Sequence, residues 1–98
     1  MQEIAEIQIT PVKPQDGLVA FASLVLNGNL YLGSIGVFTR PQGGYRLVYP
    51  TKKAGFRDIN LFHPINKDFA SQIEAAVSAK YEEVMNQNND RHYSLNTK

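Results

Sequence analysis

The sequence predicts an α+β domain in which an antiparallel β-sheet of four to five strands, connected as a meander, precedes a C-terminal amphipathic helix. Three observations support this class. Short apolar segments alternate with turn residues up to residue 50, one segment shows a clear period of two, and the apolar spacing becomes helical after residue 66. The length of 98 residues suits a single domain.

The first two segments predict strands of different environment. Residues 6–10 alternate polar and apolar side chains, which is typical of a strand with one exposed face. A turn follows at residues 14–17, where Gly17 permits a positive φ. Residues 18–26 are apolar on both faces, so this strand must be covered twice. We expect a helix over one face, and a second subunit or a folded-back hairpin over the other.

A hairpin signal links this strand to the next. Residues 27–29 read Asn-Gly-Asn, and these residue types tolerate the positive φ of tight hairpin turns. The third strand is then expected over residues 30–40, where Gly33 and Gly36 predict a bulge or a close backbone approach. After a Pro-Gln-Gly-Gly turn, residues 45–49 predict a fourth strand.

The C-terminal part predicts one helix with a single apolar stripe. Asn66 is a plausible N-cap, and Asp68 in the first turn suits the helix dipole. Spacings of three and four join the members of the stripe, Phe69, Ile73, Ala76, Val77, Lys80, Tyr81 and Val84. We interpret the stripe as core. The domain is expected to span residues 1–87, and the polar residues 88–98 are expected to form a disordered tail.

Composition excludes several classes of protein. The chain has no cysteine, which excludes a disulfide framework, a thiolate metal site and a cysteine nucleophile. The longest apolar stretch has nine residues, well short of a membrane span, and no secretion signal is visible at the N-terminus. We therefore expect a cytoplasmic protein that neither crosses nor binds a membrane.

The catalytic inventory is poor, so we expect no enzymatic activity, no metal and no cofactor. The two histidines are His63, directly before Pro64, and His92 in the polar tail. No motif for metal hydrolysis, acyl transfer or nucleotide binding is present. His63 could serve as a general base, but we favour a turn residue that hydrogen-bonds the backbone near the start of the helix.

Positive charge is concentrated in the middle of the chain. Residues 40–67 contain one acidic residue, Asp58, and six cationic ones, Arg40, Arg46, Lys52, Lys53, Arg57 and Lys67. With Tyr45, Tyr49 and Phe56 interleaved, these cations could neutralise phosphates while aromatic rings or Arg planes meet exposed bases. The alternative is a solvated loop whose charges protect a sheet edge from aggregation.

Several motifs resemble the SpoVG family, named for stage V sporulation protein G. Residues 55–59 read Gly-Phe-Arg-Asp-Ile and residues 63–66 read His-Pro-Ile-Asn, followed on the predicted helix by Ile73, Val77 and Tyr81. The family shows Phe-Arg-Asp-Ile, one residue, His-Pro-Ile and a helix with this spacing. The order and spacing of these pieces together carry the resemblance.

Upstream segments extend the resemblance to residues 4–84. Residues 22–26, Ala-Ser-Leu-Val-Leu, are similar to a family strand, and residues 49–53, Tyr-Pro-Thr-Lys-Lys, to the family's Met-Pro-Ser-Lys-Arg loop. The resemblance implies a homodimeric α+β domain. It also implies a bacterial regulator that binds DNA or RNA and affects septation, sporulation and gene expression.

The chain departs from the family pattern at three places. Residues 60–62 fill a gap in which the family has one residue. Residues 33–36, Gly-Ser-Ile-Gly, replace a stretch that often carries an Arg, and Ala70 stands where an Arg is frequent. Two candidate phosphate contacts are therefore missing, at Gly36 and Ala70, so nucleic-acid binding is expected to be weak or lost.

The motif residues are assigned two kinds of role. Because neighbours in an extended segment point to opposite faces, Arg57 and Asp58 are not expected to pair with each other. We assign a structural role to Asp58, His63, Pro64 and Asn66. Nucleic-acid contacts are assigned to the basic residues, Lys52, Lys53, Arg57, Arg46, Arg40 and Lys67.

The expected function is that of a homodimeric, non-catalytic regulator that binds DNA or RNA. The alternative is a protein-interaction module of bacterial division or sporulation whose sheet edge or basic loop meets an acidic partner.

Overall fold

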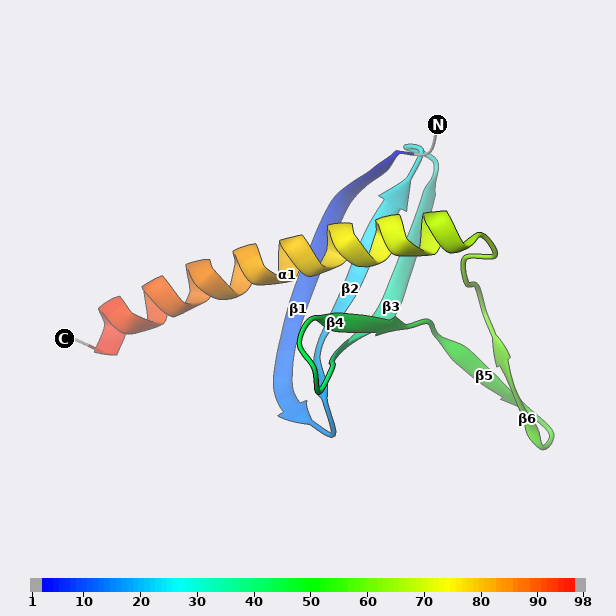
Figure 1. Ribbon diagram of the computed structural model, residues 1–98, viewed down its shortest axis with the longest axis horizontal. Helices are drawn as coiled ribbons and strands as arrows, with labels where there is room; N and C mark the ends of the chain where they lie inside the picture. The colour runs from blue at the N-terminus through cyan, green and yellow to red at the C-terminus, as the bar shows by residue number, and fades with distance from the viewer. Residues whose placement is uncertain (1–2, 97–98) are drawn as a thin grey trace.

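The computed structural model describes residues 3–96, with side chains described for residues 3–87. An antiparallel sheet is crossed by one long helix, and a separate hairpin extends away from both (Figure 1). The elements in chain order are β1 (Ile4–Gln15), β2 (Leu18–Leu26), β3 (Leu30–Thr39), β4 (Tyr45–Val48), β5 (Thr51–Ala54), β6 (Arg57–Asn60) and α1 (Lys67–Asn96).

The main sheet has the order β1-β2-β3-β4, with every neighbouring pair antiparallel. This confirms the predicted meander and the α+β class. A second sheet contains only β5 and β6, and the sequence analysis did not predict these strands. Their sequences, Thr-Lys-Lys-Ala and Arg-Asp-Ile-Asn, lack the alternation of apolar residues that marks a half-buried strand.

The hairpin between β2 and β3 follows the predicted turn chemistry. Asn27 and Gly28 have φ of 54° and 67°, the pair of positive values that a type I′ turn requires. The Asn29 amide donates to the Leu26 carbonyl at 3.0 Å and closes the turn. Gly17, in the preceding turn, has a φ of 90°. Both turns therefore lie where the sequence predicts them.

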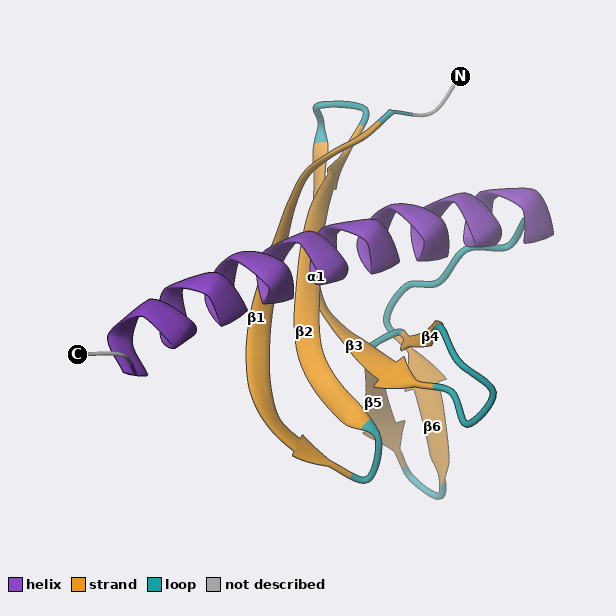
Figure 2. Ribbon diagram, turned by 60° about the vertical axis from the view of Figure 1, so that its left-hand side comes forward, coloured by secondary structure: helices purple, strands orange, loops and turns teal. Residues whose placement is uncertain are grey.

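Two bulges bend the sheet beside the middle of β2. On β3, Gly33 and Ser34 lie between the Leu32–Leu24 and Ile35–Ala22 pairs, where β2 has one residue. This confirms the irregularity predicted at Gly33, although the positive φ of 61° belongs to Ser34. A matching register shift on β1 contains Glu6, with a φ of 50°. An extra residue increases local twist, which fits the curved strands in Figure 2.

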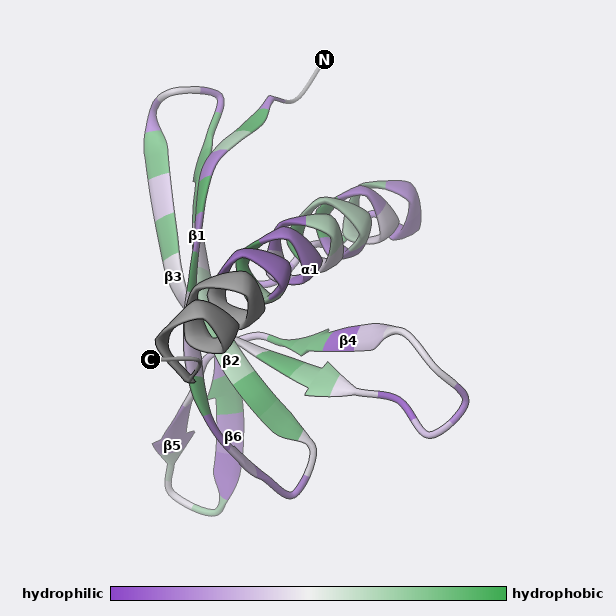
Figure 3. Ribbon diagram, turned by 90° about the vertical axis from the view of Figure 1, so that its left-hand side faces the viewer, coloured by the Kyte–Doolittle hydropathy of each residue, from purple (hydrophilic) through white to green (hydrophobic). Residues whose placement is uncertain are grey.

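Helix α1 crosses one face of the sheet, called here the inner face (Figure 2). The helical stripe predicted from the sequence supplies Ile73, Val77 and Tyr81 to the core. The strands contribute buried side chains from β2 and β3, Ala20, Ala22, Leu24, Ile35 and Val37. Apolar residues run along β2 in Figure 3. Alanine at two central positions of β2 leaves room for the helix to approach closely.

Polar contacts attach β4 and its turn to the helix. The Tyr45 hydroxyl donates to the Glu82 carboxylate, and the rings of Tyr45 and Tyr81 meet edge to face at 5.0 Å. The Arg40 guanidinium lies 2.9 Å from the carboxylate of Glu74. The hydrogen bond to Glu82, together with burial, raises the pKa of Tyr45 to about 12. These contacts hold the shortest strand of the main sheet against α1.

The helix continues to Asn96, beyond residue 87, where the sequence analysis ends the domain. In Figure 1 the C-terminal turns of α1 extend past the edge strand β1. Residues 86–96 are polar except for Tyr93 and Leu95, so they offer little apolar surface to a core. Within the part of the chain that the structure describes, no helix combines the length and the hydropathy that crossing a membrane requires.

Truncation of the core should be far more costly than truncation of the surface. Leu24, on β2, is fully buried in the core, whereas Leu30 is 54% exposed. We expect Leu24→Ala to lower the free energy of unfolding by about 3 kcal/mol, and Leu30→Ala by less than about 1 kcal/mol. Urea denaturation of both variants measures the difference. Equal losses would contradict the position assigned to the core.

Alkaline pH should destabilise the domain through two partly buried phenols, those of Tyr45 and Tyr49. Burial, followed by the negative charge of Glu74, raises the pKa of Tyr49 to about 12, as in Tyr45. Since both values exceed the ordinary 10.0, the stability contributed by the neutral phenols is complete below pH 10 and is lost as pH rises through about 12. We expect the urea midpoint to fall between pH 9 and pH 11.5, and less steeply in Tyr45→Phe/Tyr49→Phe. The same slope in this variant would contradict the assignment.

Candidate nucleic-acid interface

Strands β5 and β6 form a two-stranded arm, defined here as residues 50–61, that projects from the body of the domain (Figure 1). At its root, the Leu61 amide donates to the Pro50 carbonyl at 2.8 Å. At its tip, Gly55 takes a φ of 68°, and Phe56 completes the two-residue loop. Every residue of both strands is exposed, so this segment has no core of its own.

The arm gathers three of the six predicted cations. Lys52 lies opposite Ile59, Lys53 opposite Asp58, and Arg57 opposite Ala54. Because directly paired residues share a face and faces alternate along a strand, Lys52 and Arg57 lie on the same side as Ile59, and Lys53 lies on the other. Arg57 and Asp58 therefore point apart, as the sequence predicts.

The three arm cations are free of ion pairs within the described residues. Both ion pairs found among residues 3–87 lie elsewhere, one joining Arg40 to Glu74 and one joining Lys80 to Glu83. Exposed and unpaired ammonium and guanidinium groups can be given to phosphates without first breaking a protein contact. The arm is therefore the part of the basic segment best suited to a polyanion.

The other three predicted cations lie apart from the arm. Arg40, in the turn after β3, is already paired with Glu74. Arg46 lies on β4 with its guanidinium 4.9 Å from the centre of the Phe38 ring, a cation–π contact. Lys67 is the first residue of α1. The tertiary structure thus divides the six cations into one cluster and three separate positions.

Of the three interleaved aromatic residues, only Phe56 is available for bases. The Tyr45 ring packs on Tyr81, and the Tyr49 ring meets Phe62 edge to face at 6.0 Å. Phe56 is fully exposed at the tip of the arm. The rings of Tyr45 and Tyr49 are thus each in contact with another aromatic ring, whereas the ring of Phe56 is fully exposed.

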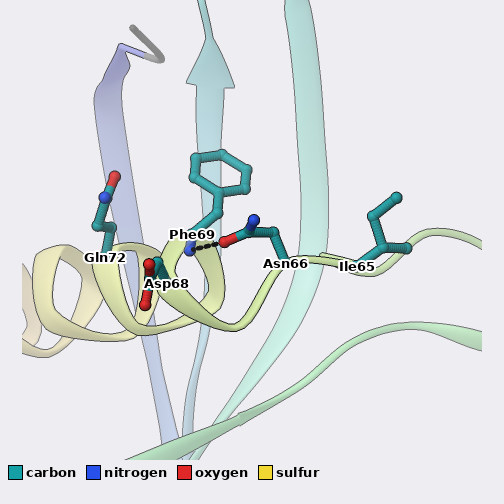
Figure 4. Close-up of a pocket in the computed structure, with 5 residues that line it drawn as sticks. All are labelled: Ile65, Asn66, Asp68, Phe69 and Gln72. Carbon is teal, nitrogen blue, oxygen red and sulfur yellow. Dashed lines mark hydrogen bonds between the residues drawn. The ribbon is translucent and has the colours of Figure 1, made fainter.

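The remaining motif residues surround the start of α1. The Asn66 side-chain oxygen accepts a hydrogen bond from the Phe69 amide at 3.0 Å, which confirms the predicted N-cap (Figure 4). His63 Nδ1 lies 3.1 Å from the Pro64 carbonyl, a contact with the backbone as expected for a turn residue. Asp58 is exposed on β6 opposite Lys53. The motif thus spans the arm and the connection to the helix.

An apolar cavity of about 180 Å³ lies beneath the connection from the arm to α1. Its lining joins the β2–β3 hairpin to the start of the helix through Leu26, Leu30, Leu32, Tyr49, Phe62, His63, Pro64, Phe69 and Ile73. His63 is the one titratable group in this lining besides the phenol of Tyr49.

A second hollow lies on the outer face of the sheet, the face opposite α1. This outer groove has a volume of about 220 Å³ and is lined by Leu18, Phe21, Ser34, Gly36, Phe38, Val48, Tyr49, Pro50 and Thr51. Phe21 is 41% exposed and Val48 is 37% exposed. In the sequence, this surface corresponds to the second apolar face of residues 18–26. That face predicted a covering element, but it did not indicate which strands would form the groove.

Comparison with known proteins agrees with the motifs placed above. The model of the SpoVG family matches residues 1–83. The chain belongs to the SpoVG family. A curated protein of Acetivibrio thermocellus named "Putative septation protein SpoVG" is 31% identical over an alignment of 85 residues that covers 84% of this chain and 87% of that protein. The resemblance read from the sequence is thereby confirmed.

The structure gives physical reasons for two departures from the SpoVG pattern. Phe62, in the longer link before His63, packs against Tyr49, so the inserted residues contribute to the contact between the arm's root and the body. A Cβ at Gly36 would lie 3.0 Å from Cε1 of Phe38, so a side chain at this position would require the Phe38 ring to shift. The missing cation at Gly36 therefore accompanies the aromatic lining of the outer groove.

Loss of the helix cap should cost a modest and specific amount of stability. Asn66→Ala removes the acceptor for the Phe69 amide, and we expect the free energy of unfolding to fall by about 1 kcal/mol. Asn66→Ser keeps an acceptor at the same position and should retain most of that stability. Urea denaturation of both variants tests the cap, and equal destabilisation by the two would contradict its role.

Proposed function

We propose that this SpoVG-family chain is a cytoplasmic, homodimeric and non-catalytic regulator that binds DNA or RNA and acts in septation or sporulation. The observation that carries the proposal is the arm, on which Lys52, Lys53 and Arg57 are exposed and without ion pairs among the described residues. The name of the Acetivibrio thermocellus relative supports the link to septation.

The shape of the arm suits a nucleic acid as much as its charge does. The major groove of duplex DNA admits a two-stranded β-ribbon, and β-ribbons are an established means of reading DNA. The arm is such a ribbon, with four residues in each strand and a two-residue loop. Phe56 at its tip presents a ring on which an unpaired base could stack.

The uncovered outer face supports the homodimer. Strand β2 is apolar on both sides, α1 covers the inner side, and the outer side keeps Phe21 and Val48 partly exposed around the outer groove. In a two-fold dimer the arm would be duplicated, so that one nucleic acid meets six arm cations instead of three.

A protein-interaction module of division or sporulation is the second candidate function. Its specific support is the apolar character of the arm and of its link to the helix, where Phe56, Ile59, Leu61 and Ile65 are all exposed. Aliphatic side chains do not stack on bases, so phosphate binding alone leaves Ile59, Leu61 and Ile65 without a role.

Fluorescence anisotropy with labelled duplex DNA and single-stranded RNA tests the proposal. Between 50 and 200 mM salt, wild-type affinity should fall about 40-fold if one arm makes three phosphate contacts, and about 1,800-fold if the two arms of a dimer make six. Lys52→Ala/Lys53→Ala should weaken binding markedly at 50 mM salt and reduce the salt dependence. Arg57→Ala tests the third arm cation separately.

A matched variant separates the arm from general charge effects. Lys13→Ala/Lys80→Ala also removes two positive charges, but at positions on β1 and α1 away from the arm. This control should bind almost as tightly as the wild type. Equal weakening by the two double variants would contradict the arm as the interface, and no binding at 50 mM salt would favour the protein-interaction module. Saturable turnover that His63→Ala abolishes would contradict the non-catalytic role.

A further inference from the structure

We propose that the arm of one copy of this chain docks on the outer sheet face of a second copy, with the reciprocal contact on the other side of a two-fold axis. The inference rests on the homodimer of the proposed function and identifies its contact surfaces. One surface is the apolar side of the arm, and the other is the outer groove around Phe21 and Phe38.

The arm lacks what a hairpin needs to be stable alone. A two-stranded hairpin in water is marginal, and independent stability requires further strands or packing on another element. One side of the arm carries Thr51, Lys53, Asp58 and Asn60, which are all polar. The other side carries Ala54 and Ile59 together with Lys52 and Arg57. The arm is thus amphipathic, and its apolar side faces solvent.

The outer face of the sheet has apolar side chains that no other element of the described chain covers. Leu18, Phe21, Phe38 and Val48 line the outer groove, whose volume of about 220 Å³ is open on the side away from α1. Of the chain's own arm, the root residues Pro50 and Thr51 line the groove, and the rest of the arm points away from the sheet with all residues of β5 and β6 exposed (Figure 1). A folded-back hairpin, the other cover expected from the sequence, is therefore not what this chain forms by itself.

The chain has two surfaces with exposed apolar residues, the apolar side of the arm and the outer groove. This pair of surfaces indicates a second copy of the same chain as the partner. A two-fold interface is isologous, so each contact between the arm of the first copy and the groove of the second is repeated between the arm of the second copy and the groove of the first. The arm begins at the groove itself, because Tyr49, Pro50 and Thr51 belong to the groove lining and lead directly into β5. A two-fold axis near this root places each arm beside the other copy's groove. The same two-fold rotation then buries the arm and the groove of both copies.

The charges on the arm are compatible with this docking. Lys52 and Arg57 flank Ile59 on the apolar side, and long cationic side chains lay their methylene stems on apolar surface while their charged groups reach water. Lys53, on the opposite side, remains fully directed to solvent. Docking therefore buries the aliphatic residues that phosphate binding leaves unused, and it keeps cations of both arms accessible to a nucleic acid.

Cysteine cross-linking between two different variants tests the contact directly. The natural chain has no cysteine, so each introduced thiol is unique. Ile59→Cys marks the apolar side of the arm and Phe21→Cys marks the outer groove, and both positions are partly exposed, which limits the damage to folding. The two variants are co-expressed, purified and oxidised, and intact mass spectrometry identifies which chains are joined. We expect a disulfide between an Ile59→Cys chain and a Phe21→Cys chain.

The alternatives give distinct results in the same experiment. Cross-linking of Ile59→Cys to itself, with none to Phe21→Cys, would mean that arms pair with arms, and would overturn the inference. A light-scattering mass of twice the 11.0 kDa chain without the mixed disulfide would also overturn it while leaving the homodimer standing. A mass of one chain at micromolar concentration would contradict the homodimer of the proposed function itself.

A pair of charge variants provides a second readout that needs no cross-link. Ile59→Asp places a carboxylate on the apolar side of the arm and should shift the light-scattering mass from two chains toward one. Ile65→Asp alters an apolar residue that is 93% exposed but belongs to neither surface, and it should leave the mass unchanged. Dissociation by Ile65→Asp with none by Ile59→Asp would overturn the inference.

Discussion

The structure depends on one constraint, which is that β2 is apolar on both faces while a single chain of this size has one helix to cover it. Helix α1 satisfies the inner face by packing Ile73, Val77 and Tyr81 over the alanines of β2. On the outer face a groove lies around Phe21, and no second layer covers it among the residues that the structure describes. The proposed dimer is a consequence of this unequal coverage.

Backbone irregularity makes the covered face possible. Bulges on both neighbours of β2, with positive φ at Glu6 and Ser34, bend the strands beside the helix crossing. On the outer face, the Phe38 ring lies beside Gly36, which has no side chain. The absence of a side chain at Gly36 lets the Phe38 ring lie against the backbone there.

The basic segment shows how a charge pattern acquires a geometry. The six cations of residues 40–67 are separated in the fold. Arg40 is paired with Glu74, and Arg46 contacts the Phe38 ring. Lys67 is the first residue of α1. Only Lys52, Lys53 and Arg57 remain together, on an arm that has no core of its own. A function for this segment must therefore account for both its charges and its exposed apolar residues.

The sequence by itself determined the meander, the Asn27–Gly28 turn, the bulge near Gly33, the helical stripe and the Asn66 cap, because each of these depends on local periodicity or on the backbone preference of one residue type. It did not reveal β5 and β6, because their stability does not come from an apolar face packed on the same chain. It also did not separate Phe56 from Tyr45 and Tyr49. Only the tertiary structure decided which cations and which rings remain free, since pairing across the fold joins residues that are distant in the chain.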